Sequence, residues 1–158
     1  MELLYQRFVV PVDGSQGDDR VLDVIRFLAD RQPVSVTLVY VVEVLQSMPL
    51  DAELPAEVAR GEAVLKAAEA ATRAIGGKTN SVHTELLQAR ATGAAIVDEA
   101  IERNADVILM AATTRRHHGK TTVGETVSYV LKNAPCEVVV VRLPPADADA
   151  EAGNPTWA

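Results

Sequence analysis

The segment from residue 106 to residue 142 constrains the fold more than any other part of the chain. It begins with a short apolar run, residues 107–112, which is too brief for a buried helix and predicts a strand. Residues 113–122 are polar and basic and are predicted to form a loop, and residues 124–133 carry apolar side chains at helical spacing up to Pro135. Four consecutive valines then predict a strand that is covered on both faces. The segment is therefore predicted to fold as a strand, a loop, a helix and a second, parallel strand.

The rest of the chain alternates in the same way. β-branched and other apolar residues predict three further strands, at residues 8–12, 34–42 and 81–87, the last with the polar alternation of an edge strand. Amphipathic stripes predict three further helices, at residues 18–31, 55–75 and 93–103, with Thr92 as a candidate N-cap of the third. Five strands and four helices in alternation predict an α/β fold with one doubly wound, five-stranded parallel sheet in a single domain.

Composition narrows the class of protein. A formal net charge of −7 and an aromatic content of 4% argue against general nucleic-acid binding. No apolar run is long enough to cross a membrane and no signal peptide is visible, so we expect a cytoplasmic protein without membrane insertion. Cys136 precedes a buried strand and is expected to pack as a small hydrophobic residue. Residues 144–158 combine prolines, alanines and acidic residues, which predicts a disordered acidic tail after a domain of residues 1–143.

One cluster of basic residues stands out on this acidic chain. Arg115, Arg116 and Lys120 lie together with two histidines in the predicted loop at the carboxyl end of a strand. In open parallel sheets anionic ligands bind at that place, so the cluster indicates an anionic ligand or partner; the alternative is a solvated loop. Asp13 follows the first strand. It either accepts hydrogen bonds from a base or sugar or caps the following helix.

Other chemistries find little support in the sequence. Gly119, Lys120 and Thr121 suggest a phosphate-binding P-loop, but Thr114 stands where that motif needs its first glycine. The pair His117 and His118 lacks further ligands at metal-binding spacing, so no metal is predicted. No nucleophile, general base or metal cage can be assembled from spacing, which favours binding over catalysis.

Several stretches together resemble the universal stress protein family. They are residues 10–15, 38–43, 93–97, 105–110 and 130–142, and the sequence NAPCEVVVV at residues 133–141 is the most specific of them. The resemblance extends over residues 8–142. It implies an adenine nucleotide alpha hydrolase-like fold with strand order 3-2-1-4-5, and a homodimer formed through the last strand at Val138, Val139, Val140 and Val141.

Nucleotide-binding members of that family carry the motif Gly-x2-Gly-x9-Gly-Ser/Thr after the fourth strand. The matching positions here are Ala111, Thr114, Gly124 and Glu125, so only one motif glycine is kept. The lost glycines and the carboxylate of Glu125 would weaken triphosphate binding. The resemblance thus implies an adenine nucleotide, either AMP, a cyclic dinucleotide or ATP, or none. The implied site residues are Pro11, Val12, Asp13, Val41, Met110, Ala111, Thr113, Thr114, Arg115, Arg116, Gly124, Glu125, Thr126 and Val127.

The resemblance implies a nucleotide-sensing regulatory module in the stress response. Because residues 124–136 also resemble stress-protein-like domains attached to membrane transporters, a regulatory domain of an amino-acid or cation transporter is one alternative. A weak ATP-binding hydrolase is the other.

Overall fold

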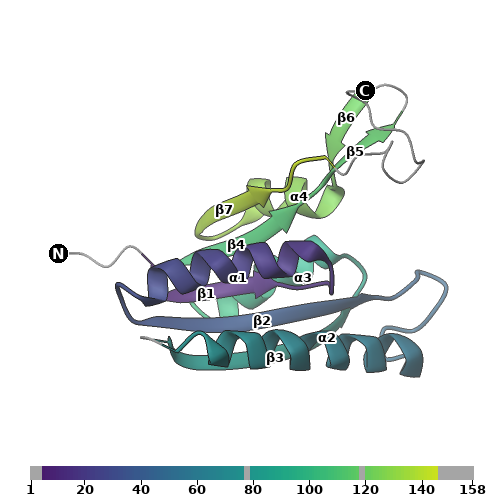
Figure 1. The fold of residues 1–158 in the computed structure, drawn as a ribbon. Helices are drawn as coiled ribbons and strands as arrows, with labels where there is room; N and C mark the ends of the chain where they lie inside the picture. The colour runs from purple at the N-terminus through teal and green to yellow at the C-terminus, as the bar shows by residue number, and fades with distance from the viewer. Residues whose placement is uncertain (1–4, 77–78, 118–119, 146–158) are drawn as a thin grey trace, which may run out of the picture.

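The computed structural model describes residues 5–76, 79–117 and 120–145. Five strands form one parallel sheet in the order β3-β2-β1-β4-β7 (Figure 1). This order confirms the predicted 3-2-1-4-5 arrangement. The strands are β1 (Arg7–Pro11), β2 (Val34–Glu43), β3 (Thr79–Ala89), β4 (Val107–Ala112) and β7 (Glu137–Arg142).

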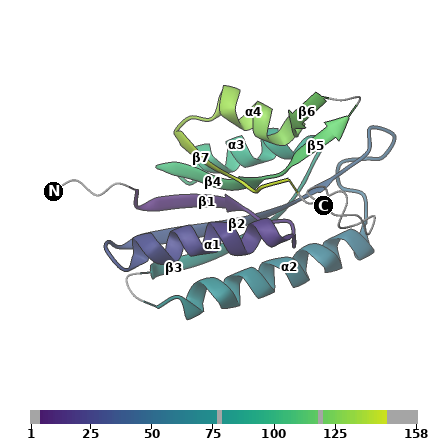
Figure 2. The same ribbon diagram turned by 45° about the horizontal axis from the view of Figure 1, so that its top comes forward.

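Helices cover both faces of the sheet, as expected of a doubly wound fold. Figure 2 shows α1 and α2 on one side of the sheet and α3 and α4 on the other. Their bounds are α1 (Gln16–Ala29), α2 (Pro55–Ala74), α3 (Thr92–Glu102) and α4 (Glu125–Asn133). In the described part of the chain, no helix is long and apolar enough to cross a membrane.

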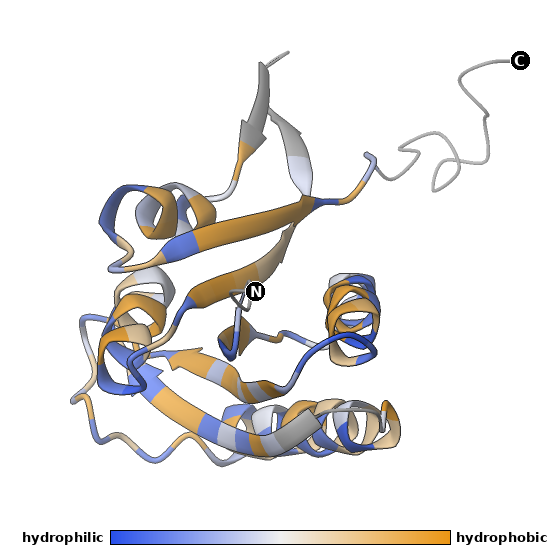
Figure 3. Cartoon of the chain, turned by 90° about the vertical axis from the view of Figure 1, so that its left-hand side faces the viewer, coloured by the Kyte–Doolittle hydropathy of each residue, from blue (hydrophilic) through white to orange (hydrophobic). Residues whose placement is uncertain are grey.

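The core consists of two apolar layers separated by the sheet (Figure 3). Alternate strand residues enter each layer, because successive side chains of a strand point to opposite faces. In β7, Val139 and Val141 pack against the α1/α2 layer, and Val138 and Val140 pack against the α3/α4 layer. The predicted coverage of both faces is therefore present, although these valines are only half-buried. Half-buried Cys136 also packs against the α3/α4 layer, as predicted, and burial raises the pKa of its thiol.

The structure corrects the prediction for the stretch between β4 and α4. Residues 113–122 were predicted to be a loop, but the chain forms an antiparallel two-stranded ribbon of β5 (Thr114–His117) and β6 (Lys120–Val123). The β-branched residues Thr121, Thr122 and Val123 favour extended backbone. They were not recognised as a strand because the stretch lacks the alternation of apolar and polar residues. Figure 1 shows the ribbon projecting beyond the sheet.

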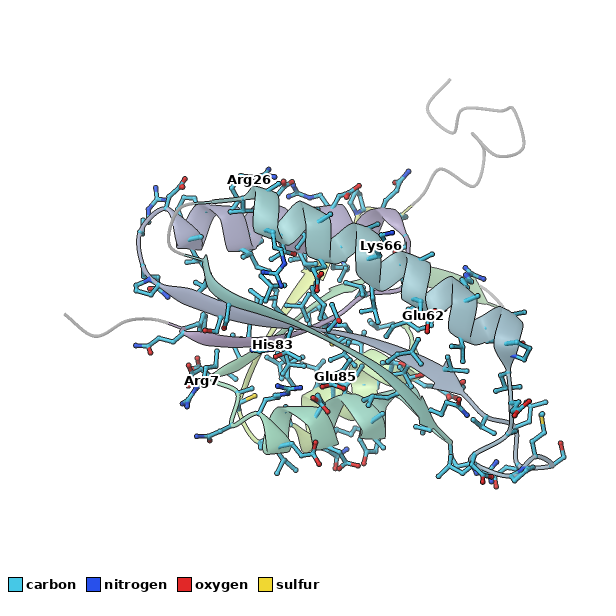
Figure 4. The ribbon with its side chains drawn as sticks, turned by 90° about the horizontal axis from the view of Figure 1, so that it is seen from below. Arg7, Arg26, Glu62, Lys66, His83 and Glu85 are labelled. Carbon is cyan, nitrogen blue, oxygen red and sulfur yellow. The ribbon has the colours of Figure 1, made fainter. Side chains whose placement is uncertain are left out.

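The strand β3 is an edge strand, as its alternation predicts. Figure 4 shows His83 and Glu85 on the side of this strand that faces away from α2. There Glu85 pairs with Arg103, which also donates to the buried carboxylate of Glu99 at 2.9 Å. These ion pairs connect the edge strand with the carboxyl end of α3.

Candidate functional site

A cleft of about 840 Å³ opens at the carboxyl ends of β1 and β4. These two strands are neighbours, but the chain continues from β1 toward one edge of the sheet and from β4 toward the other. Such a switch point leaves a crevice between the connections that follow the two strands, and ligands of doubly wound proteins bind there. The amino-terminal ends of α1, α3 and α4 also line the cleft.

Most of the predicted site residues line this cleft. The lining includes Pro11, Val12, Asp13, Val41, Met110, Ala111, Thr113, Gly124, Glu125, Thr126 and Val127. Thr114, the first residue of β5, is not part of the lining. The side chains of Arg115 and Arg116 lie outside the part of the chain that the structure describes, as does His118. The fold thus brings most of the predicted residues together, and their binding to a nucleotide stays a prediction.

The turn between β1 and α1 is closed by its own side chains. Ser15 is the N-cap of α1 and accepts a hydrogen bond from the backbone N–H of Gly17 at 3.3 Å. The carboxylate of Asp18 accepts from the N–H groups of Asp13 and Gly14 at 3.1 and 2.8 Å. Asp13 in turn accepts from the N–H of Ser15 at 2.9 Å, so it orders the turn but is not the cap of α1. Burial, together with the nearby carboxylates of Asp13 and Asp19, raises the pKa of Asp18, although its two backbone hydrogen bonds act to lower it.

At the amino end of α3, a glutamate from β2 takes the place of a cap. The carboxylate of Glu43 accepts from the N–H and the hydroxyl of Thr92 at 3.1 and 2.8 Å. The predicted N-cap role of Thr92 is therefore wrong, since Ala91 is the N-cap and Thr92 is the first helical residue. A carboxylate is a stronger acceptor for a helix N–H than a hydroxyl, so the distant Glu43 replaces the local cap. Sequence reasoning missed Glu43, although its position at the end of β2 was a usable signal.

The amino end of α4 differs from the other two. Its N-cap is Gly124, which has no side chain to cap the helix. Glu125, Thr126 and Val127 of its first turn line the cleft. The first N–H groups of a helix lack intrahelical partners, and together with the helix dipole they favour an anion. Of the three helix ends at the cleft, α4 therefore has the strongest preference for an anionic ligand group.

Charge restricts which anion fits. The lining contains the carboxylates of Asp13, Asp18, Glu43 and Glu125, and no Lys or Arg is among the described residues that line it. These carboxylates repel ligands that carry several negative charges close together. Among the residues that the structure describes, no group of three or more His, Cys, Asp or Glu side chains could hold a metal ion.

The fold and the cleft define a doubly wound, Rossmann-like α/β domain with a crevice at its switch point. A sequence profile of the Universal stress protein family matches residues 4–142, so the chain belongs to the universal stress protein family. A universal stress protein of Methanocaldococcus jannaschii is 31% identical over 149 residues, which covers 90% of this chain and 85% of that protein.

Solved structures share the fold. The universal stress protein UspA from Lactobacillus plantarum has a TM-score of 0.69 at 25% identity, covering 89% of this chain and 100% of that chain. A universal stress protein from Archaeoglobus fulgidus has a TM-score of 0.67 at 25% identity, covering 87% and 98% of the two chains. More distant universal stress proteins, solved in complex with dAMP, with cAMP and with AMP, have TM-scores of 0.63, 0.62 and 0.63.

Proposed function

We propose that this protein is a nucleotide-sensing regulatory module whose cleft binds an adenine nucleotide with few phosphate charges, either AMP or a cyclic adenine dinucleotide. The amino end of α4, which faces the cleft without a side-chain cap, is the observation that carries the proposal. The membership of the chain in the universal stress protein family supports the choice of an adenine nucleotide. The proteins of the same fold that were solved in complex with dAMP, cAMP and AMP support it as well.

The nucleoside would occupy the inner part of the cleft. Val39, Val41, Ile96 and Met110 give this part apolar walls, which suit the faces of a base. Asp13 lies on the lining with a carboxylate that accepts hydrogen bonds. A ribose hydroxyl or a base N–H is the matching donor.

The phosphate would bind at the amino end of α4. Its N–H groups can hold one phosphate group, whereas Glu125 in the same turn repels further negative charge. Ala111 and Thr114 also replace glycines of the nucleotide-binding motif, so backbone N–H groups come less close to a phosphate chain. These features favour one phosphate group over three.

The experiment is native mass spectrometry of the purified protein for a bound nucleotide, followed by calorimetry with adenosine, AMP, a cyclic adenine dinucleotide and ATP. We expect AMP or the cyclic dinucleotide to bind more tightly than adenosine or ATP, with an affinity that falls as salt rises. The combined variant Ala111→Gly, Thr114→Gly, Glu125→Ser should shift the preference toward ATP. Tight ATP binding by the unmodified chain would contradict the proposal.

The two alternative functions stay predictions. A weak hydrolase would convert ATP in a turnover assay with and without magnesium, whereas a binding module would leave it intact. Regulation of a transporter would require a complex between this chain and a membrane protein.

A further inference from the structure

One end of the cleft is a slot between β2 and α3. The strand β1 ends at Pro11, which pairs with Val39, so β2 continues past the end of β1 to Glu43 (Figure 1). Because successive side chains of a strand point to opposite faces, Val39, Val41 and Glu43 lie on the same face of β2. Ile96 of α3 belongs to the apolar layer on that face, and all four residues line the cleft. An apolar slot therefore follows the end of β2 and reaches Glu43.

The carboxylate of Glu43 closes the outer end of this slot. Its Oε1 accepts hydrogen bonds from the N–H and the hydroxyl of Thr92, the first residue of α3. Thr92 lies about one turn before Ile96 on the helix, so the carboxylate bridges the two walls of the slot. Both hydrogen bonds use Oε1, and Oε2 accepts none from the residues that the structure describes. Among these residues, Oε2 therefore keeps its full capacity to accept a hydrogen bond from a ligand.

The charge of Glu43 restricts what can bind at Oε2. The described residues that line the cleft include no Lys or Arg, so none of them forms an ion pair with this carboxylate. An ionised carboxylate only accepts hydrogen bonds, and it repels the oxygen of a carbonyl group. A flat apolar ring with an N–H donor on its outer edge therefore fits the slot, whereas the same ring without a donor loses a hydrogen bond there.

The slot and the amino end of α4 lie on opposite sides of β1. In the sheet, β1 stands between β2, which forms the slot, and β4, after which the chain leads to α4. Both the slot residues and the first turn of α4 line the same cleft. A nucleotide whose phosphate binds at the amino end of α4 therefore extends its base toward β2, with the outer edge of the base at Glu43.

We propose that Glu43 is a specificity-determining residue of the cleft, whose Oε2 accepts a hydrogen bond from the exocyclic amino group of an adenine base. Thr92 is its positioning residue, because the two hydrogen bonds from Thr92 hold the carboxylate at the end of the slot. The inference rests on the proposed binding of an adenine nucleotide. It adds the group that distinguishes this base from purines without an amino group.

The first test compares AMP with purine riboside 5′-monophosphate, which has the same ring system, ribose and phosphate but no amino group. Calorimetry on the full chain should show that AMP binds about tenfold more tightly, because only AMP forms the hydrogen bond to the charged Glu43. Equal affinities would overturn this inference and leave the proposed function standing. If neither nucleotide binds, this inference is wrong, and the proposed function is wrong as well unless the cyclic adenine dinucleotide binds.

The second test repeats this comparison with variants of the full chain. In Glu43→Gln the amide oxygen can still accept from Thr92, which turns the NH₂ group toward the base, so the preference for AMP should disappear. Glu125→Gln removes the same charge at the α4 end of the cleft. It should strengthen the binding of both nucleotides alike and keep their affinity ratio. A ratio that survives Glu43→Gln, or that falls equally in Glu125→Gln, would overturn the role of Glu43.

The variant Thr92→Val tests the positioning of the carboxylate. It keeps the backbone N–H of residue 92 but removes the hydroxyl, so Glu43 loses one of its two hydrogen bonds to α3. The preference for AMP should fall, by a smaller factor than in Glu43→Gln, whereas the affinity for purine riboside 5′-monophosphate should stay the same. An unchanged preference would overturn the positioning role of Thr92. Because this variant leaves Glu43 in place, it also decides the question if Glu43→Gln does not fold.

Discussion

At the scale of single residues, Gly17 and Ala111 meet on the wall of the cleft. A Cβ built on Gly17 would lie 2.6 Å from the Cβ of Ala111, closer than two such atoms approach in proteins. Gly17→Ala should therefore lower the free energy of unfolding by about 1–3 kcal/mol, even though alanine is the better helix former. Chemical denaturation measures this loss. The double variant Gly17→Ala, Ala111→Gly should recover most of it, and a double variant as unstable as the single one would contradict the contact.

Asp13 allows its two predicted roles to be separated. Its Oδ1 accepts from the N–H of Ser15, and asparagine can keep that bond, whereas alanine cannot. If the carboxylate also contacts the nucleoside, both Asp13→Asn and Asp13→Ala should weaken AMP binding by about 1–3 kcal/mol. Only Asp13→Ala should also lower the melting temperature. If both variants keep the affinity for AMP and Asp13→Ala loses stability, Asp13 only orders the turn between β1 and α1 and does not contact the nucleoside.

The lining residues were predictable where they follow a strand directly. Asp13 and Ala111 lie at the ends of β1 and β4, and the predicted strand ends place them at one edge of the sheet. Asp18 and Glu43 were not predicted as site residues. The hydrogen bonds that Asp18 forms with the turn, and Glu43 with Thr92, depend on how each loop folds back, which residue spacing does not specify.

At the scale of elements, the five strands of the sheet and the four helices were predictable because buried strands and amphipathic helices leave different periods in the sequence. The ribbon of β5 and β6 was not. Its two strands do not belong to the five-stranded sheet, no apolar pattern marks them in the sequence, and the basic residues indicated a loop. The sequence prediction of strands failed here because these two strands pair only with each other and leave no apolar period in the sequence.

Asp106 joins β4 to the start of β1 and gives a pH-dependent prediction. Its carboxylate accepts from the N–H groups of Gln6 and Arg7 at 3.0 and 2.8 Å and from the guanidinium of Arg7 at 3.1 Å. Burial by itself would raise the pKa of Asp106, but the hydrogen bonds from Arg7 and Gln6, together with the positive charge of Arg7, lower it overall. The ionised carboxylate of Asp106 therefore stabilises the folded state at pH values above the ordinary carboxyl range. This stabilisation is lost as the pH falls through the lowered folded-state pKa of Asp106.

The variant Asp106→Asn removes this contribution. At pH 7 we expect it to lower the free energy of unfolding by about 1 kcal/mol, a modest value because the pair is partly exposed. The difference in the free energy of unfolding between this variant and the unmodified protein should shrink as pH falls below about 4. Denaturant titrations at several pH values measure it, with Asp51→Asn at an exposed position as the control. A difference that is constant from pH 7 to pH 2 would exclude titration of Asp106 as its cause.

At the scale of the whole molecule, the two edges of the sheet differ in character. The edge strand β3 carries exposed His83 and half-buried Glu85, polar residues that discourage pairing with another sheet. The other edge strand, β7, carries four half-buried valines between Glu137 and Arg142. An apolar edge with free backbone groups favours pairing, so we propose that two copies associate through β7, as the sequence predicts.

An isologous pair of β7 strands runs antiparallel, which brings Glu137 of one copy close to the Arg142 end of the other. Arg142→Glu therefore places like charges together at both ends of the interface and should raise the dissociation constant of the dimer about tenfold. Glu137→Arg combined with Arg142→Glu restores opposite charges and should recover the dimer. Both changes spare the valines that pack in the core. Sedimentation equilibrium measures the constants, and Arg60→Glu, an exposed site on α2, is the control. A monomeric unmodified protein, or a dimer indifferent to both variants, would exclude this interface.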